Sequence, residues 1–538
     1  MNKVRLKNIR VAVSLAIMIG LTLALVGLPG SAKVGNWLAT LQFIPSLLAL
    51  TAGVSLSLAC VVIVALTLLA GRIYCSFICP LGALQDVIAR ISSRYKGKCK
   101  KLTYTKPVPH IRATIFLLTV VGVVSGWAGL VLSLLDPYSN FGRIVSSLLR
   151  PLFGFFVQAI PGIAKAKETA GAYPSALHWG GLGALAVPII VLGVVGVLAA
   201  LRGRLYCNTL CPVGTLLGFI SKHAAFQLQI DDGCLKCLKC VRVCKAQCID
   251  PRSGSIDASR CVSCYNCIPE CKGKFIGHRL TWGTKSDLSA DKGATLAATN
   301  HGEPLVATNF QRRAVMTSGA LALVGAVGSE LLWANDNKAT GQGGDRDRKP
   351  SDLNVLQDRA VRPPGSTSLD RFLSHCTACQ LCVSTCPTHV LTPSSLLDGV
   401  SGYMKPQLNF AASYCDYNCN RCGQVCPSGA LDALGLLAKQ RTRIGLARLD
   451  ASRCIVQAKQ TACTRCIDHC PTKAIDTVAI GGNLRLPHVK ALLCVGCGRC
   501  EHECPVDGRK AISVFGLLRE THIPTVVFSE KSGLRSDN

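Results

Sequence analysis

The sequence predicts an α-helical membrane bundle of four transmembrane helices, joined to small α+β modules that each enclose two metal clusters. Long runs without charge occupy the N-terminal part, and six runs of four cysteines occupy the rest. Charged residues make up only 17% of the 538 residues, and the mean hydropathy is +0.35. Such a composition is typical of a membrane part joined to soluble parts.

Four charge-free segments are long enough to span a bilayer, namely residues 11–32, 49–71, 113–135 and 181–201. Basic residues are frequent before the first segment and between the second and third, so the positive-inside rule places the N-terminus and this connector in the cytoplasm. An outside loop is expected before residue 49. Residues 144–164 are apolar but interrupted by Arg150, Pro151 and Pro161, so they predict an interfacial or re-entrant piece.

A C-x3-C-P motif follows the second and fourth segments, which makes the membrane part an internal repeat. The two motifs contain Cys75 and Cys79, and Cys207 and Cys211. Residues i and i+4 share one face of a helix, so each motif can present two thiols together. These four cysteines are candidate redox residues, either as a dithiol/disulfide relay or as one shared metal site. Buried, inert cysteine is the simpler alternative.

Three charged residues lie near the ends of the predicted spans. Asp86, Asp136 and Arg143 are expected to be interface anchors rather than quinone ligands.

The six cysteine runs use 24 of the 31 cysteines, and four of them have the form C-x2-C-x2-C-x3-C. This is the bacterial [4Fe–4S] pattern, in which the last cysteine of one run ligates the cluster of the other run. It predicts six clusters in two-cluster ferredoxin-like modules. Structural zinc sites usually combine two C-x2-C pairs that are separated in sequence, and disulfide frameworks belong to short secreted chains. Zinc sites and disulfides are therefore both disfavoured. The predicted ligand sets are Cys234, Cys237, Cys240 and Cys271; Cys261, Cys264, Cys267 and Cys244; Cys376, Cys379, Cys382 and Cys426; Cys415, Cys419, Cys422 and Cys386; Cys454, Cys463, Cys466 and Cys504; and Cys494, Cys497, Cys500 and Cys470.

The order of these features predicts the domains. Residues 1–220 form the membrane domain, 221–285 a two-cluster domain, 371–525 a four-cluster domain and 526–538 a tail. Residues 286–344 form a linker in which Arg312 and Arg313 precede an apolar run, as in a twin-arginine signal. Residues 345–370 form a flexible linker.

Neither nucleic-acid binding nor bound b-type haem is expected. The formal net charge is +29, but six oxidised clusters with their thiolates would offset about 12 charges. Many of the remaining basic residues flank the spans and no basic recognition motif is present, so nucleic-acid binding is not expected. The spans contain no pair of histidines, so bound b-type haem is not expected either.

On these motifs, residues 1–280 resemble the NapH/MauN family of membrane ferredoxins, which also share Asp136-Pro-Tyr-Ser with Gly142-Arg143. Residues 308–520 resemble the NapG/MauM family of polyferredoxins. The chain therefore looks like a fusion of the two, although Lys245 and Lys272 replace the proline that often follows a run.

The resemblance implies an electron-transfer subunit of a quinol dehydrogenase rather than a stand-alone enzyme. It would draw electrons from the membrane quinone pool, with quinol as donor, and pass them to a periplasmic reductase or cytochrome c. It would be a multi-pass protein of the cell inner membrane, with the first ferredoxin domain cytoplasmic and the polyferredoxin domain periplasmic. The alternatives are a redox biogenesis factor that supplies electrons for maturation of another metalloenzyme, and a scaffold with purely structural clusters.

Overall fold

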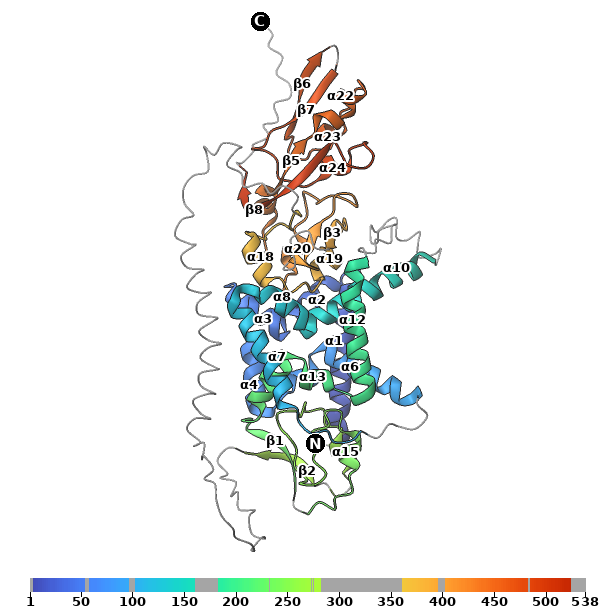
Figure 1. Ribbon diagram of the computed structural model, residues 1–538, viewed down its shortest axis with the longest axis vertical. Helices are drawn as coiled ribbons and strands as arrows, with labels where there is room; N and C mark the ends of the chain where they lie inside the picture. The colour runs from blue at the N-terminus through green and yellow to red at the C-terminus, as the bar shows by residue number, and fades with distance from the viewer. Residues whose placement is uncertain are drawn as a thin grey trace, which may run out of the picture.

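Three parts are stacked along the long axis of the molecule in the computed structural model (Figure 1). A helical part lies in the middle, and a cluster module lies at each end. The described residues are 3–53, 58–95, 102–159, 182–231, 233–271, 273, 275–281, 360–394, 402–481 and 484–523. The expected twin-arginine signal at Arg312 and Arg313 and the linker around it lie outside them.

Two helices of the described part, α1 (Lys3–Val26) and α12 (Leu182–Arg202), are long and apolar enough to cross a membrane. The helices α2 (Ser31–Thr40) and α3 (Phe43–Thr51) make a third candidate if the pair, bent by 79°, is one broken span. Four spans were expected, so this count is lower.

The second expected span, residues 49–71, is the main difference. The stretch predicted as an outside loop forms α2 and α3 instead, and α4 (Ala59–Ala70) has only 12 residues. The stretch carries no charge and is largely apolar, so it supports helix along most of its length, and Gly53 at φ 77° ends α3. Hydropathy alone could not locate that break.

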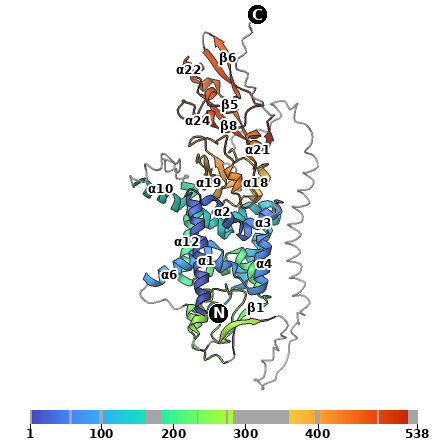
Figure 2. The ribbon, with the colours of Figure 1, turned by 180° about the vertical axis from the view of Figure 1, so that it is seen from behind.

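The third expected span is also divided. It consists of α7 (Pro109–Gly122), a π-helical turn η1 (Val123–Trp127) and α8 (Ala128–Leu135), which lies at the end of the bundle below α18 (Leu369–His375) of the second module (Figure 1). The next helix, α9 (Pro137–Ile144), begins at Asp136, whose carboxylate accepts hydrogen bonds from the backbone N–H groups of Tyr138 and Ser139. After the π-helical turn η2 (Val145–Leu149), α10 (Arg150–Ala159) projects sideways from the bundle, in keeping with an interfacial piece (Figure 2).

Each C-x3-C-P motif joins a short helix to a longer one. The first motif joins α5 (Tyr74–Phe77) to α6 (Pro80–Tyr95), and the second joins α13 (Leu205–Thr209) to α14 (Pro212–Ser221). Proline has no N–H and is favoured at the first position of a helix, so the chain breaks before it. The expectation of a continuous helix carrying both thiols is therefore wrong.

The first module pairs β1 (Phe226–Ile230) antiparallel to β2 (Ile276–Leu280), with Phe226 opposite Leu280. Its helices are α15 (Lys239–Val243) and α16 (Cys267–Glu270). It packs on the end of the bundle where α1 begins (Figures 1 and 2).

Within its described residues, the second module contains three antiparallel sheets of two strands each. The pairs are β3 (Leu391–Pro393) with β4 (Pro406–Leu408), β5 (Thr442–Leu449) with β8 (Ile512–His522), and β6 (Ile475–Gly481) with β7 (Leu484–Val489). Its helical segments are α18 (Leu369–His375), α19 (Leu381–Thr385), α20 (Arg421–Gln424), α21 (Leu436–Arg441), η5 (Ala451–Arg453), α22 (Ile455–Ala458), α23 (Arg465–Asp468) and α24 (Arg499–His502). Many core positions are cysteines.

The second module packs tightly on the end of the bundle opposite the first. A Cβ atom on Gly27, just after α1, would lie 2.9 Å from the carbonyl oxygen of Ser384, and one on Gly142 of α9 would lie 2.3 Å from that of Cys379. The bundle therefore separates the two modules.

Candidate iron–sulfur centres

The structure brings together each predicted set of four cysteines. In the first module, Cys234, Cys237, Cys240 and Cys271 line one cavity of about 180 Å³. Cys244 lies within electrostatic range of Cys261, Cys264 and Cys267. The surplus thiol of Cys248 lies 3.6 Å from that of Cys244.

Two sets in the second module line small cavities of about 20 Å³ each. One is lined by Cys386, Cys415, Cys419 and Cys422, and the other by Cys470, Cys494, Cys497 and Cys500. In both, the fourth cysteine comes from the neighbouring run, as in two-cluster modules.

In the remaining two sets, which contain Cys379 and Cys466, the thiols are close enough to raise one another's pKa. Burial and the nearby thiolates of Cys426 and Cys376 raise the pKa of the Cys379 thiol to about 12. Burial, with Cys463, Cys454 and Cys504, raises the pKa of Cys466 to about 12. Four soft thiolate donors per site, drawn from two runs, are the donor set that [4Fe–4S] clusters take.

The loops that hold these cysteines share a backbone conformation. In all four regular runs, the residues on either side of the second cysteine have positive φ. These residues are Lys236 and Leu238, Ser263 and Tyr265, Ala378 and Gln380, and Gly496 and Gly498. Alternating conformations of this kind turn successive N–H groups inward and create an anion-binding concavity. Only the glycines signal this in the sequence, because at the other positions side chains accept a conformation that costs about 1 kcal/mol or more each.

The two C-x3-C-P motifs meet inside the bundle. Cys75, Cys79, Cys207 and Cys211 are each at most 5% exposed, and every pair of these thiols lies within electrostatic range. Glycine permits this approach, since a Cβ on Gly214 of the second motif would lie 2.9 Å from Nη2 of Arg72, which precedes the first motif.

Of the three charged residues that were expected at the membrane interface, the structure buries Asp136 and Arg143 and leaves Asp86 partly exposed. Asp86 forms ion pairs with Arg10 (2.6 Å), Arg204 (2.9 Å) and Lys245 (3.1 Å). Burial alone would raise the pKa of Asp86, but Arg204, Lys245 and Arg10 outweigh it and hold the pKa well below the usual range. This carboxylate ties α1, α6 and the first module together.

Asp136 and Arg143 are buried at the opposite end of the bundle, 2% and 1% exposed. They flank Tyr138, which is fully buried. They belong to α9 or its cap, and Gly142 of this helix lies against the carbonyl oxygen of Cys379 of the second module.

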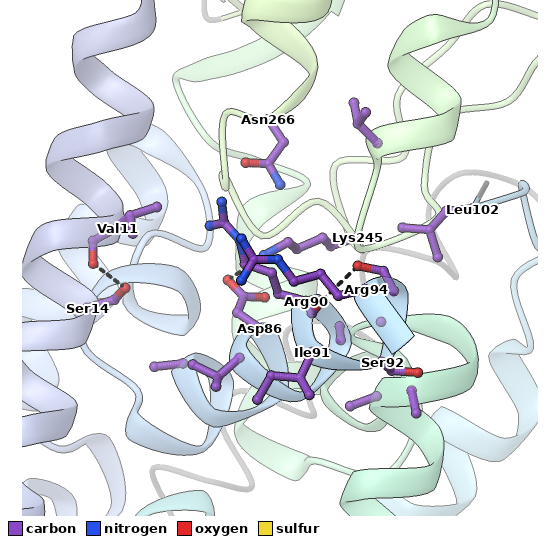
Figure 3. Close-up of a pocket in the computed structure, with 18 of the residues that line it drawn as sticks. Val11, Ser14, Asp86, Arg90, Ile91, Ser92, Arg94, Leu102, Lys245 and Asn266 are labelled. Carbon is purple, nitrogen blue, oxygen red and sulfur yellow. Dashed lines mark hydrogen bonds and ion pairs between the residues drawn. The ribbon is translucent and has the colours of Figure 1, made fainter. Parts of the chain in front are cut away.

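A cavity of about 410 Å³ lies between α1, α6, the end of α12 and the first module (Figure 3). Val11 and Ser14 lie on its α1 side, and Lys245 and Asn266 face it from the first module. Its charged lining residues are Lys7, Arg10, Arg90, Arg94, Arg242, Lys245, Asp86 and Glu270. The cavity adjoins the Cys244–Cys267 centre, because Lys245 and Asn266 are the sequence neighbours of two of its cysteines.

Two family models match the chain. One, described as "4Fe-4S binding domain", matches residues 51–99 and 184–230, which contain the two C-x3-C-P motifs. The other, described as "4Fe-4S dicluster domain", matches residues 375–430 and 439–508, with two cysteine runs in each part. No solved structure is significantly similar to the chain.

Named relatives match as well. The ferredoxin-type protein NapF of Escherichia coli (strain K12) is 31% identical over 136 residues, which is 25% of this chain and 74% of the relative. The ferredoxin-type protein NapG of the same strain is 33% identical over 203 residues, 35% of this chain and 76% of the relative. The methylamine utilization ferredoxin-type protein MauM of Paracoccus denitrificans (strain Pd 1222) is 32% identical over 146 residues, 26% of this chain and 63% of the relative.

Proposed function

Because the chain belongs to the family of ferredoxin-type proteins that includes NapF and NapG, we propose that it carries electrons across a membrane. It takes them from quinol at the first module and delivers them from the second module to a periplasmic reductase or cytochrome c. It is a membrane subunit of NapH/MauN type fused to a polyferredoxin of NapG/MauM type. When bound, six [4Fe–4S] clusters supply one-electron redox chemistry; the cysteines hold them.

The observation that carries this proposal is the placement of cluster modules at both ends of an apolar helical bundle. Lys7 and Arg10 lie at the same end as the first module, where Arg10 and Lys245 share Asp86. Basic residues favour the cytoplasmic side. The first module is then cytoplasmic and the second lies on the outer side of the inner membrane.

We assign quinol oxidation to the cavity beside the first module. Its volume of about 410 Å³ falls in the range of small-molecule sites. Residues of α1 and α12 line it, so an apolar tail can reach it from the bilayer, and Lys245 and Asn266 offer polar partners for the ring oxygens.

Quinol-driven reduction tests this assignment. Val11→Trp fills the cavity, while Val13→Trp adds the same bulk on the exposed side of α1. The first variant should reduce its clusters slowly with quinol and normally with dithionite, and the second should match the wild type with both. Normal quinol kinetics in Val11→Trp would show that quinol does not bind in this cavity. No reduction of the wild type by quinol would favour the biogenesis factor.

Topology is tested separately with a reporter that is active only outside the cytoplasm, fused after Asn538. Activity is expected in the native chain and should vanish when Arg312 and Arg313 are both changed to lysine. An inactive native fusion would place all the clusters in the cytoplasm and refute the transmembrane route.

A further inference from the structure

We propose that Cys75, Cys79, Cys207 and Cys211 together ligate one further iron–sulfur cluster inside the helical bundle. The ligand set stands whatever the electron donor is, whereas the role of this cluster as a relay rests on the proposed function. Six clusters were expected from the cysteine runs, and none of those runs includes these four residues.

Convergence of the four thiols is the first argument. They come from two separate repeats, yet all are buried and every pair is in electrostatic range. The cysteines of an iron–sulfur cluster ligate different irons, so four thiols from two separate loops can hold one cluster.

Charge is the second argument. Arg72 is fully buried, and its hydrogen bonds go to Asn208, to two carbonyl oxygens and to the thiol of Cys75 at 3.8 Å. No carboxylate among the described residues pairs with it. A buried guanidinium without a counter-charge is costly. Four thiolates around an iron–sulfur core carry net negative charge and supply what Arg72 lacks.

The N–H groups around the sulfurs are the third argument. The amide of Gln85 faces Cys207 Sγ, with Nε2 at 3.4 Å and Oε1 at 3.5 Å, and only its N–H can bond to a thiolate. The backbone N–H of Gly214 donates to Cys211 Sγ at 3.3 Å. Hydrogen bonds to sulfur stabilise the charged form of a cluster and tune its potential. A disulfide relay gains little from such donors, because a disulfide carries no charge.

On the side of the first module, single hydrogen bonds connect the centre to the loop around Cys261. Arg72 Nη1 donates to the carbonyl oxygen of Ser259 at 3.1 Å, and Ser76 donates to that of Ser263 at 3.3 Å.

On the side of the second module, Tyr206 precedes Cys207 and is in electrostatic range of Asp136. Asp136 caps α9, which contacts Cys379. The centre therefore lies between the two modules. The proposed cluster would accept one electron from a reduced cluster of the first module and give it to an oxidised cluster of the second, with no proton or bond exchanged.

Iron content and electron paramagnetic resonance of the full-length protein test the ligand set. Cys79→Ala combined with Cys211→Ala should lose about two to four irons per chain and one resonance signal. The matched control is Cys60→Ala, which removes a buried cysteine of α4 outside the centre and should lose neither. Unchanged iron in the double variant, zinc at the site, or a disulfide between any of the four cysteines in the wild type would overturn the proposal.

A milder variant keeps the test decisive if the double variant does not fold. Gln85→Leu removes the N–H donor to Cys207 but keeps the volume and all four thiols. One signal should shift to lower potential while the other signals stay in place. Potentials identical to the wild type throughout would refute a cluster at Cys207, whereas quinol kinetics bear only on the proposed function.

Discussion

Nη2 of Arg72 lies 3.2 Å from the carbonyl oxygen of Cys207, a residue of the opposite repeat. Arg204 returns the contact, since its guanidinium donates to the carbonyl oxygen of Cys75. Each repeat thus holds the cysteine loop of the other. The two motifs are positioned as a pair, and neither thiol pair can be moved without disturbing its partner.

Arg72→Gln should lower the potential of one redox centre and leave the other centres unchanged. Removing a buried positive charge destabilises the more negative reduced state. A loss of about 1.4 kcal/mol corresponds to about 59 mV for one electron. A redox titration followed by electron paramagnetic resonance measures this, and Arg72→Lys should recover part of the shift. Equal shifts in Arg72→Lys and Arg72→Gln would contradict a role for charge.

Gly214→Ala should destabilise the bundle by roughly 1–3 kcal/mol, the usual cost of overpacking. The new methyl group would lie 2.1 Å from the carbonyl oxygen of Cys207 in the same motif and 2.9 Å from Nη2 of Arg72 in the other repeat. Gly193→Ala is the matched control on α12, because its Cβ meets nothing within 4 Å, and a helical alanine should gain up to about 1 kcal/mol. Unfolding in detergent compares the two, and equal stability would argue against close contact of the motifs.

Asp86→Asn should cost roughly 3–5 kcal/mol, because it leaves buried cations without their counter-charge. Arg10 and Arg204 are 2% and 0% exposed. Asp370→Asn, on the exposed start of α18, should change little. Limited proteolysis should then release the first module more readily from the Asp86→Asn protein only. Equal protection in both variants would show that Asp86 does not hold the module in place.

The cysteine patterns were sufficient to predict which thiols come together, because the spacing of a run restricts which thiols can share a cluster. Hydropathy predicted α1 and α12 well. It failed for residues 34–71 and 113–135, where a charge-free sequence gives no sign of the breaks at Gly53 and at the π-helical turn. The ion pairs of Asp86 join segments distant in sequence, which no local pattern encodes.

The pH dependence of stability should depend on His389, which accepts a hydrogen bond from Arg150 of α10 at 3.0 Å. Burial, and then Arg150, lower the pKa of His389 to about 4. Its neutral form therefore stabilises the fold above the unfolded pKa of about 6.5, and this contribution is lost as the pH falls towards 4. Between pH 7 and pH 5 the wild type should lose roughly 1 kcal/mol more than His389→Gln, allowing for solvent screening. Thermal unfolding of both proteins measures the difference, and the control is His488→Gln, a change at an exposed histidine. Parallel pH profiles for His389→Gln and wild type would show that His389 does not contribute to the pH dependence of stability.

Removal of iron should unfold the second module. Its strand pairs have only two strands each, and cysteines occupy many of its core positions. Such sheets do not bury enough apolar surface to fold alone, so cluster binding provides the folding free energy, as metals do in other small domains. Far-ultraviolet circular dichroism after anaerobic chelation should lose the strand signal while the bundle helices keep theirs. The helices are an internal control, because α1 and α12 carry none of the predicted cluster ligands. Native-like strand signal in the iron-free protein would show that the clusters serve electron transfer without supporting the fold.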